Sequence, residues 1–265
     1  MLSALVIIPL IFVIVWFGHP DAWHFYFYPI LVAAVATLGA LEFYGMIGLS
    51  KRHPLTIFGL LFVLLFIANA YFDLAYTIPL LTAAVAFSLI WLIFRSTVEG
   101  AAINWVWTVA GIIYIGWMLS HFIPLRVLEG GRDWVFFTLF ATFAVDTAAF
   151  FTGRAIGRHA LASAISPGKT WEGAVGGFLG AIAASLILAA ILPGIVIPYW
   201  QIVLLGALIG IFAQLGDLAE SMLKRSVGVK DASKLIPGHG GLLDRLDSII
   251  FTVVVVYYYV IWVVV

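Results

Sequence analysis

The charged side chains most able to do chemistry gather near the end of the chain, between residues 216 and 248. Asp217, Glu220 and Lys224 are spaced by three or four residues, which places them on one face of a helix. A charged helix face that points into hydrocarbon is costly. This face must therefore border a cavity or another part of a protein.

A second acidic pair, Asp244 and Asp247, begins a later apolar run, where carboxylates also suit the positive end of a helix dipole. Between the two acidic sets lies a glycine turn at 238–241, whose backbone amides can approach an anion closely. Carboxylates, lysines and such a turn fit a site for Mg²⁺ and a polyphosphate. Magnesium takes one or two protein carboxylates and completes its shell with phosphate oxygens and water. The chain has no cysteine, so thiolate metal sites are excluded.

A simpler explanation of the basic residues stays open. Lys224, Arg225, Lys230 and Lys234 could set the membrane topology or touch anionic lipid head groups, with the acids as their ion-pair partners. The formal net charge is zero, and no basic stripe with interleaved aromatic residues is present. A nucleic-acid partner is therefore not expected.

A second polar segment covers residues 146–177. Asp146 lies inside an apolar run, where an ionisable residue marks a functional position or a contact between helices. Residues 168–170 read GKT, but a phosphate-binding P-loop is excluded because the first glycine of that motif is missing. What remains is a short turn from Ser166 to Lys169 that could offer a hydroxyl, backbone amides and an ammonium to a phosphate. Glu172 follows three residues later.

The elements that must position these residues are membrane helices, since 64% of the 265 residues are hydrophobic and only 10% are charged. Several apolar runs are long enough to cross roughly 30 Å of hydrocarbon. Lipid offers no partner for an unpaired backbone group, so such runs must be helices. We predict an all-α polytopic integral membrane protein with about nine spans, near 2–17, 27–47, 55–71, 76–94, 101–122, 134–152, 174–192, 197–222 and 246–265.

The basic residues indicate the orientation of these spans. With nine spans, eleven of the thirteen lysines and arginines fall in one set of connecting segments and two fall in the other. The positive-inside rule then places the N-terminus and the loops 153–172 and 223–245 in the cytoplasm, and the C-terminus outside. An even number of spans remains open if two short helices form one re-entrant element.

Two regions differ in their content of motifs. Residues 1–133 contain the predicted spans one to five and are motif-poor, whereas residues 134–265 contain spans six to nine and the polar segments. Glu42, inside the second span, could line the same cavity or pair with another helix. Glycines 173, 176, 177 and 180 permit close packing against a helix of the same chain or of another protomer.

The stretch SMLKRSVGVKDASKLIPGHGGLLDRLD, residues 221–247, resembles the signature of phosphatidate cytidylyltransferases, also called CDP-diacylglycerol synthases. FTGR and SPGKTWEG, near Asp146, resemble the second characteristic region of that family. The resemblance covers roughly the last 120 residues. One departure is the absence of basic residues before Lys51, where family members often carry them ahead of the first span.

The resemblance implies roles for individual residues. Asp217 and Asp244 are expected to hold the metal, with Asp247 and Asp231 available for a second cation or as outer support. The residues expected to carry catalysis are Lys224, Arg225, Lys230 and His239, the last as a donor to phosphate or a loop-orienting group. Phosphate and substrate binding is expected from Ser166, Lys169, Ser221, Gly240, Gly241 and Arg245, with support from Asp146, Glu172 and Glu220.

The implied reaction converts CTP and phosphatidate into CDP-diacylglycerol and pyrophosphate with Mg²⁺. It implies a homodimer in the bacterial inner membrane with its site on the cytoplasmic side. One alternative is a CTP-dependent polyprenol or phytol kinase, which would need a general base and attack at the γ-phosphorus. Another is an ion-coupled transporter that uses Asp146, Asp217 and Glu220 as a relay, which predicts polar residues spread through the bilayer depth.

Overall fold

The computed structural model describes residues 12–16, 27–72, 74–94, 99–233 and 240–264. Contacts divide the chain into two compact units, each built from two stretches of sequence. The first unit comprises Met1–Pro124 and Asp231–Leu243, and the second comprises Leu125–Lys230 and Asp244–Val265. This division follows spatial contacts, whereas the sequence boundary at residues 133 and 134 follows the motif content.

The first unit is a group of apolar helices. Helix α3 begins after His53, whose ring Nδ1 accepts a hydrogen bond from the Leu55 amide, and Pro54 occupies the first helical position. Helix α3 packs against α2, α4 and the π-helical segment η2. The core there is formed by Phe62, Phe66, Ala84 and Ile112. The helices are α2 (Phe27–Met46), α3 (Pro54–Ala70), α4 (Thr77–Ile93), α5 (Ala101–Gly111), η2 (Ile112–Trp117) and α6 (Met118–Ser120).

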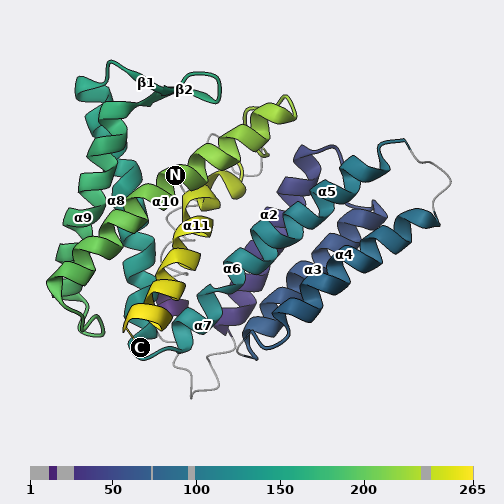
Figure 1. Ribbon diagram of the computed structural model, residues 1–265, viewed down its shortest axis with the longest axis horizontal. Helices are drawn as coiled ribbons and strands as arrows, with labels where there is room; N and C mark the ends of the chain where they lie inside the picture. Colours follow the sequence, from purple (N-terminus) through teal and green to yellow (C-terminus); the bar gives the residue numbers. More distant parts are fainter. Residues whose placement is uncertain (1–11, 17–26, 73, 95–98, 234–239, 265) are drawn as a thin grey trace. The chain divides into compact units, whose positions relative to one another are not determined.

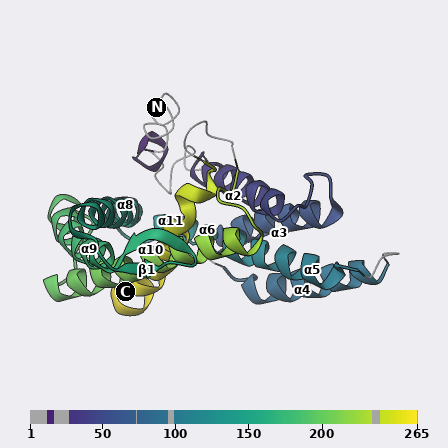
Figure 2. The same cartoon turned by 90° about the horizontal axis from the view of Figure 1, so that it is seen from above.

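The second unit contains the motif-rich helices and a small hairpin. Helix α9 packs against both α8 and α10, and Figure 2 shows α8 and α9 side by side. The hairpin joins the end of α8 to the start of α9 (Figure 1). The elements are α7 (Phe122–Val127, which contains the boundary between the units), α8 (Gly131–Ile156), β1 (Ala160–Ala162), β2 (Ser166–Thr170), α9 (Trp171–Ile191), α10 (Tyr199–Ser226), α11 (Leu243–Tyr259) and η3 (Val260–Val264).

Small residues bring α8 and α9 close together. A Cβ atom added to Gly177 would lie 3.1 Å from the Ala149 Cβ and 3.1 Å from the Val145 carbonyl oxygen. A larger residue at 177 would therefore push the two helices apart. The sequence left the partner of this glycine stripe open, and the structure shows that α8 of the same chain is one.

The membrane character is confirmed. Within the described residues, six helices are long and apolar enough to cross a membrane, and two more apolar helices, Pro54–Ala70 and Thr77–Ile93, have 17 residues each. The prediction of nine spans and a cytoplasmic N-terminus stays a prediction, because most of the first span, 2–17, lies outside the described residues. Helix α8 ends at Ile156 and α10 at Ser226, each four residues beyond the predicted span. A helix need not end where its apolar stretch ends.

Candidate active site

The hairpin contributes a lysine to the second unit. Lys169 lies in β2, which pairs antiparallel with β1 through Ser166 with Ala162 and Thr170 with Ala160. The expected turn from Ser166 to Lys169 is therefore wrong, because pairing with β1 extends these residues into a strand. The Lys169 Nζ lies 2.6 Å from the Asp217 Oδ2 on α10.

This ion pair is accessible. The Lys169 side chain is 26% exposed and that of Asp217 is 31% exposed. Pairs with such access to solvent contribute little to stability, since water competes for both charges. Lys169 and Asp217 can therefore separate and bind other ions without loss of the fold.

A second lysine joins α10 to α11. The Lys224 Nζ lies 2.5 Å from the Glu220 Oε2 on its own helix and 2.6 Å from the Asp244 Oδ1 on α11. The contact with Glu220 follows from the four-residue spacing that placed both residues on one face. All three side chains are largely shielded, with exposed fractions of 12% for Lys224, 1% for Glu220 and 13% for Asp244. Separating a pair with this degree of burial would leave a charge poorly solvated.

Carboxylates from three helices of the second unit share one electrostatic environment. The charges of Asp146 on α8, Asp217 on α10 and Asp247 on α11 interact with one another. The charges of Lys169 and Arg245 also act on Asp146. The Ser221 Oγ lies 3.4 Å from the Asp217 Oδ1 and adds a weak polar contact. The helices thus gather acids that stand far apart in the sequence.

These acids suit a hard cation, although they do not form a ready-made cage. In the part of the chain that the structure describes, no group of three acidic or histidine side chains is arranged to hold a metal ion. Mg²⁺ does not need one, because phosphate oxygens and water fill most of its shell. Asp217 and Asp244 offer the oxygen ligands that it prefers, and a divalent cation would offset the repulsion of Asp217 with Asp146 and Asp247. The donor set therefore fits Mg²⁺.

Glu172 holds the base of the hairpin. Its Oε1 lies 2.6 Å from the His159 Nδ1, and its Oε2 accepts hydrogen bonds from the backbone amides of Arg158 and His159 at 3.1 and 3.3 Å. At the other end of the hairpin, the Arg225 Nε donates to the Ile165 carbonyl oxygen at 3.3 Å. Both Glu172 and Arg225 thus fix the segment that carries Lys169.

The structure distributes the remaining predicted site residues between the two units. Lys230 is exposed and ends a stretch of the second unit, while Asp231 is exposed and starts a stretch of the first. Gly240 and Gly241 also belong to the first unit. His239 lies outside the described residues. The roles assigned to these residues stay predictions.

The sequence did not reveal the role of Glu42, on α2 in the first unit. Its Oε1 accepts hydrogen bonds from the Ser233 Oγ at 2.6 Å and the Leu242 amide at 3.0 Å. Its Oε2 accepts from the Leu243 amide at 2.7 Å. Glu42 thus holds Ser233 and the backbone of Leu242 and Leu243. The only local signal was a single carboxylate in an apolar helix.

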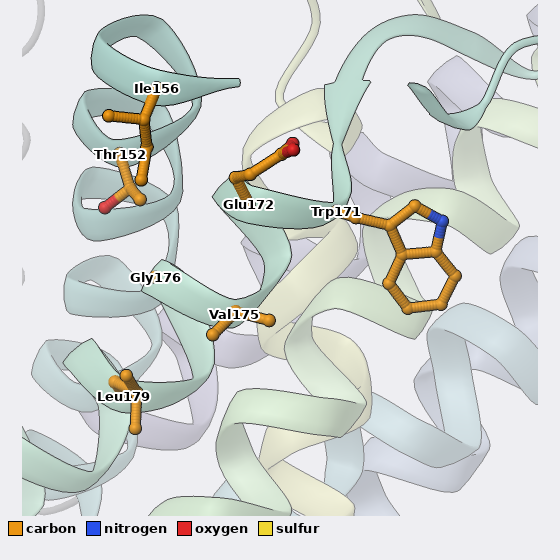
Figure 3. A pocket seen from close by; sticks show the side chains of 7 residues that line it. All are labelled: Thr152, Ile156, Trp171, Glu172, Val175, Gly176 and Leu179. Atoms are coloured by element: carbon orange, nitrogen blue, oxygen red, sulfur yellow. The ribbon is translucent and has the colours of Figure 1, made fainter. Parts of the chain in front are cut away.

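A groove of about 570 Å³ lies between α8 and α9, and Glu172 is one of its lining residues. Figure 3 shows Thr152 and Ile156 of α8 on one wall and Val175 and Leu179 of α9 on the other, with the Trp171 ring pointing away from α8. Its one ionisable lining residue is Glu172, which already binds His159. With a mostly apolar lining and no cation, the groove is not the phosphate site.

Comparison with known proteins shows which family the chain resembles. Residues 1–263 match the model of the cytidylyltransferase family. A phosphatidate cytidylyltransferase of Brucella suis is 41% identical over 157 residues, which cover 57% of this chain and 56% of that protein. One from Bacillus subtilis is 41% identical over 149 residues, which cover 55% of this chain and 54% of that protein. The chain thus spans about half the length of these curated relatives.

A longer match extends through the motif-poor part. A phosphatidate cytidylyltransferase of Synechocystis is 33% identical over an alignment of 298 positions, which covers 98% of this chain and 95% of that protein. The similarity is therefore not confined to the segments that carry the charged residues. Together with the family model that matches residues 1–263, this relative shows that the chain belongs to the cytidylyltransferase family.

Proposed function

We propose that this chain is a phosphatidate cytidylyltransferase, which transfers the cytidylyl group of CTP to phosphatidate. The observation that carries the proposal is the pairing of two acids with two lysines, Lys169 with Asp217 and Lys224 with Asp244. Each pair contains one ligand for a cation and one for a phosphate. The names of the relatives from Brucella suis, Bacillus subtilis and Synechocystis support the same activity.

The reaction needs positioning and charge neutralisation more than proton transfer. A phosphate oxygen of phosphatidate forms a bond to the α-phosphorus of CTP. The bond from that phosphorus to the bridging oxygen of the β-phosphate breaks, and pyrophosphate leaves with the electron pair. The attacking group is already ionised, so no base must remove a proton from it. Alignment of two polyanions and stabilisation of the charge that develops are the main tasks.

The two ion pairs can perform these tasks by exchanging partners. Lys169 and Lys224 would bind phosphate oxygens, while Asp217 and Asp244 would hold Mg²⁺. When bound, Mg²⁺ would neutralise phosphate charge and orient the leaving group. Lys169, Asp217, Lys224 and Asp244 would thereby each meet a new partner, while the buried Glu220 would keep its contact with Lys224.

Other residues are proposed to complete the site. Asp247 and Asp146 would support the metal ligands from the outside, and Asp231 is a candidate for a second cation. Further contacts to phosphate are proposed for Ser166, Ser221, Arg225, Lys230, His239, Gly240, Gly241 and Arg245.

The chain is an integral membrane protein, and we place its site at the cytoplasmic surface of a bacterial inner membrane. The support is the one-sided distribution of lysine and arginine in the sequence. A water-soluble nucleotide and a lipid phosphate would meet at that surface. We further propose a homodimer, on the strength of the family resemblance.

The decisive experiment uses purified protein, phosphatidate, Mg²⁺ and CTP labelled at the α-phosphate. The expected products are labelled CDP-diacylglycerol and unlabelled pyrophosphate, and chelation of Mg²⁺ should stop their formation until the metal is added back. Absence of labelled lipid with several acyl-chain variants would contradict the proposal. With CTP labelled at the γ-phosphate, transfer of label to a polyprenol or phytol would identify a kinase instead.

A further inference from the structure

Glu42 is the one charged residue in the sequence of α2, and its side chain is buried, with 7% of the residue exposed. A buried carboxylate is costly unless hydrogen bonds replace its water. Three donors do so here: the Ser233 hydroxyl and the amides of Leu242 and Leu243. All three donors come from one short part of the chain, on either side of residues 234–239.

Two of these donors stand at a helix start. Leu243 is the first residue of α11, and the first amides of a helix have no partner within the helix. A carboxylate at this position satisfies such amides and is stabilised by the helix dipole. Glu42 therefore acts as an N-terminal cap for α11, although it is separated from Leu243 by 201 residues.

Gly241 lies against this carboxylate. A Cβ atom added to Gly241 would lie 2.6 Å from the Glu42 Oε2 and 3.0 Å from its Cδ. Gly240 has a φ of 79°, in the left-handed region that favours glycine. The two glycines therefore let the chain turn and approach Glu42, a reason for glycine that does not depend on any ligand.

We infer that Glu42 is a positioning residue that fixes the start of α11 and, through the chain, the adjacent Asp244. Asp244 follows Leu243 directly and is bound by Lys224. Displacement of this helix start would misplace Asp244 toward its cation and lower the rate without removing any reacting group. The part of this inference that concerns turnover rests on the proposed function. The part that concerns the helix start does not.

The test replaces Glu42 by glutamine. Glu42→Gln keeps the size of the side chain but exchanges one acceptor oxygen for an NH₂ group, which cannot accept from an amide. In ligand-free protein, amide hydrogen exchange in peptides covering residues 240–245 should become faster. In the lipid-synthesis assay, kcat should fall about tenfold and the Mg²⁺ concentration for half-maximal rate should rise about tenfold. The KM for phosphatidate should not change.

Two further variants control this experiment. Gly241→Ala should change both readouts in the same direction, because its methyl group would collide with the carboxylate. Gly45→Ala is the matched control on the same helix, since an added Cβ there meets nothing within 4 Å. It should leave exchange and turnover as in the unmodified protein.

Unchanged exchange in residues 240–245, or unchanged turnover and Mg²⁺ requirement per folded molecule, in Glu42→Gln would overturn the inference. If that variant does not fold, Ser233→Ala decides it by the same two readouts, because Ser233 is not among the residues proposed to contact substrate. If the unmodified chain makes no CDP-lipid, the proposed function fails, whereas the exchange experiment still decides whether Glu42 fixes the helix start.

Discussion

Glu42 of the first unit and the predicted metal ligands of the second unit differ in what binds their carboxylates. In the first unit, the described residues that bind Glu42 are neutral donors, a hydroxyl and two backbone amides. In the second unit, Asp217 and Asp244 are bound by lysines. Amide hydrogen bonds are directional and hold a backbone in place, whereas an ion pair with a lysine can be exchanged for a pair with another ion. The carboxylate of Glu42 thus holds the backbone in place, whereas those of Asp217 and Asp244 form ion pairs that can change partners.

The two lysines of the second unit differ in turn. Lys224 is shielded together with Glu220 and Asp244, while Lys169 and Asp217 are both partly open to solvent. Loss of Lys224 should therefore affect stability as well as turnover. Loss of the Lys169 pair should affect turnover alone.

The largest effect is expected from Lys224→Met, which leaves Glu220 and Asp244 without their shared cation. We expect a loss of about 3 kcal/mol in the free energy of unfolding, as for other broken buried pairs. Turnover should fall about a thousandfold. Denaturation in detergent and the lipid-synthesis assay measure the two effects. Adding Glu220→Gln to this variant should restore much of the stability and none of the activity. Recovery of turnover would show that Lys224 has only a structural role.

Asp217→Asn and Asp244→Asn should each lower kcat about a hundredfold or more, because each removes a charged ligand while keeping the shape. The proteins should remain folded by size-exclusion chromatography and thermal unfolding. Near-normal turnover in either variant would remove that residue from the metal site. Asp133→Asn is the matched control: this buried acid of α8 binds Arg132 and the Gly194 amide. It should lower stability without changing turnover per folded molecule.

Exchange of the charges within one pair tests whether the pair itself matters. In the double variant Lys169→Asp with Asp217→Lys, an ion pair can still form between β2 and α10, so the fold should be kept. Activity should be about a hundredfold lower than in the unmodified protein, because the lysine and the carboxylate have exchanged positions. Activity close to that of the unmodified protein would mean that the pair acts only as a link between the hairpin and α10.

The smallest effect is expected from Glu172→Gln. This change weakens the contact with His159 and loosens the hairpin, but removes no group proposed to touch substrate. We expect about a threefold drop in turnover and faster hydrogen exchange in residues 157–170, an effect on the scale of one exposed polar contact. His159→Ala should give a similar result, and the double variant should be no worse than either single one. Additive losses would indicate that the two residues act separately.

Short-range features were predictable from the sequence and long-range ones were not. The contact between Glu220 and Lys224 follows from helical periodicity alone. The pairing of Lys169 with Asp217 requires the hairpin. Its strands form because the C-terminal end of α8 and the N-terminal end of α9 lie close together. No local pattern in residues 160–170 reports that closeness. The ends of α8 and α10 could not be read from hydropathy, because each helix continues four residues beyond the apolar run that predicted its span.

Glu42 forms hydrogen bonds with residues that are synthesised much later than it is. Its partner Ser233 follows 191 residues later in the chain, and the amides of Leu242 and Leu243 follow 200 and 201 residues later. A ribosome that adds about 5 to 20 residues per second needs about 10 to 40 seconds to make that stretch. The carboxylate is thus in the nascent chain long before the donors that satisfy it exist. The start of α11 becomes fixed only near the end of synthesis, so a partly made chain has the early helices without the helix start that precedes Asp244.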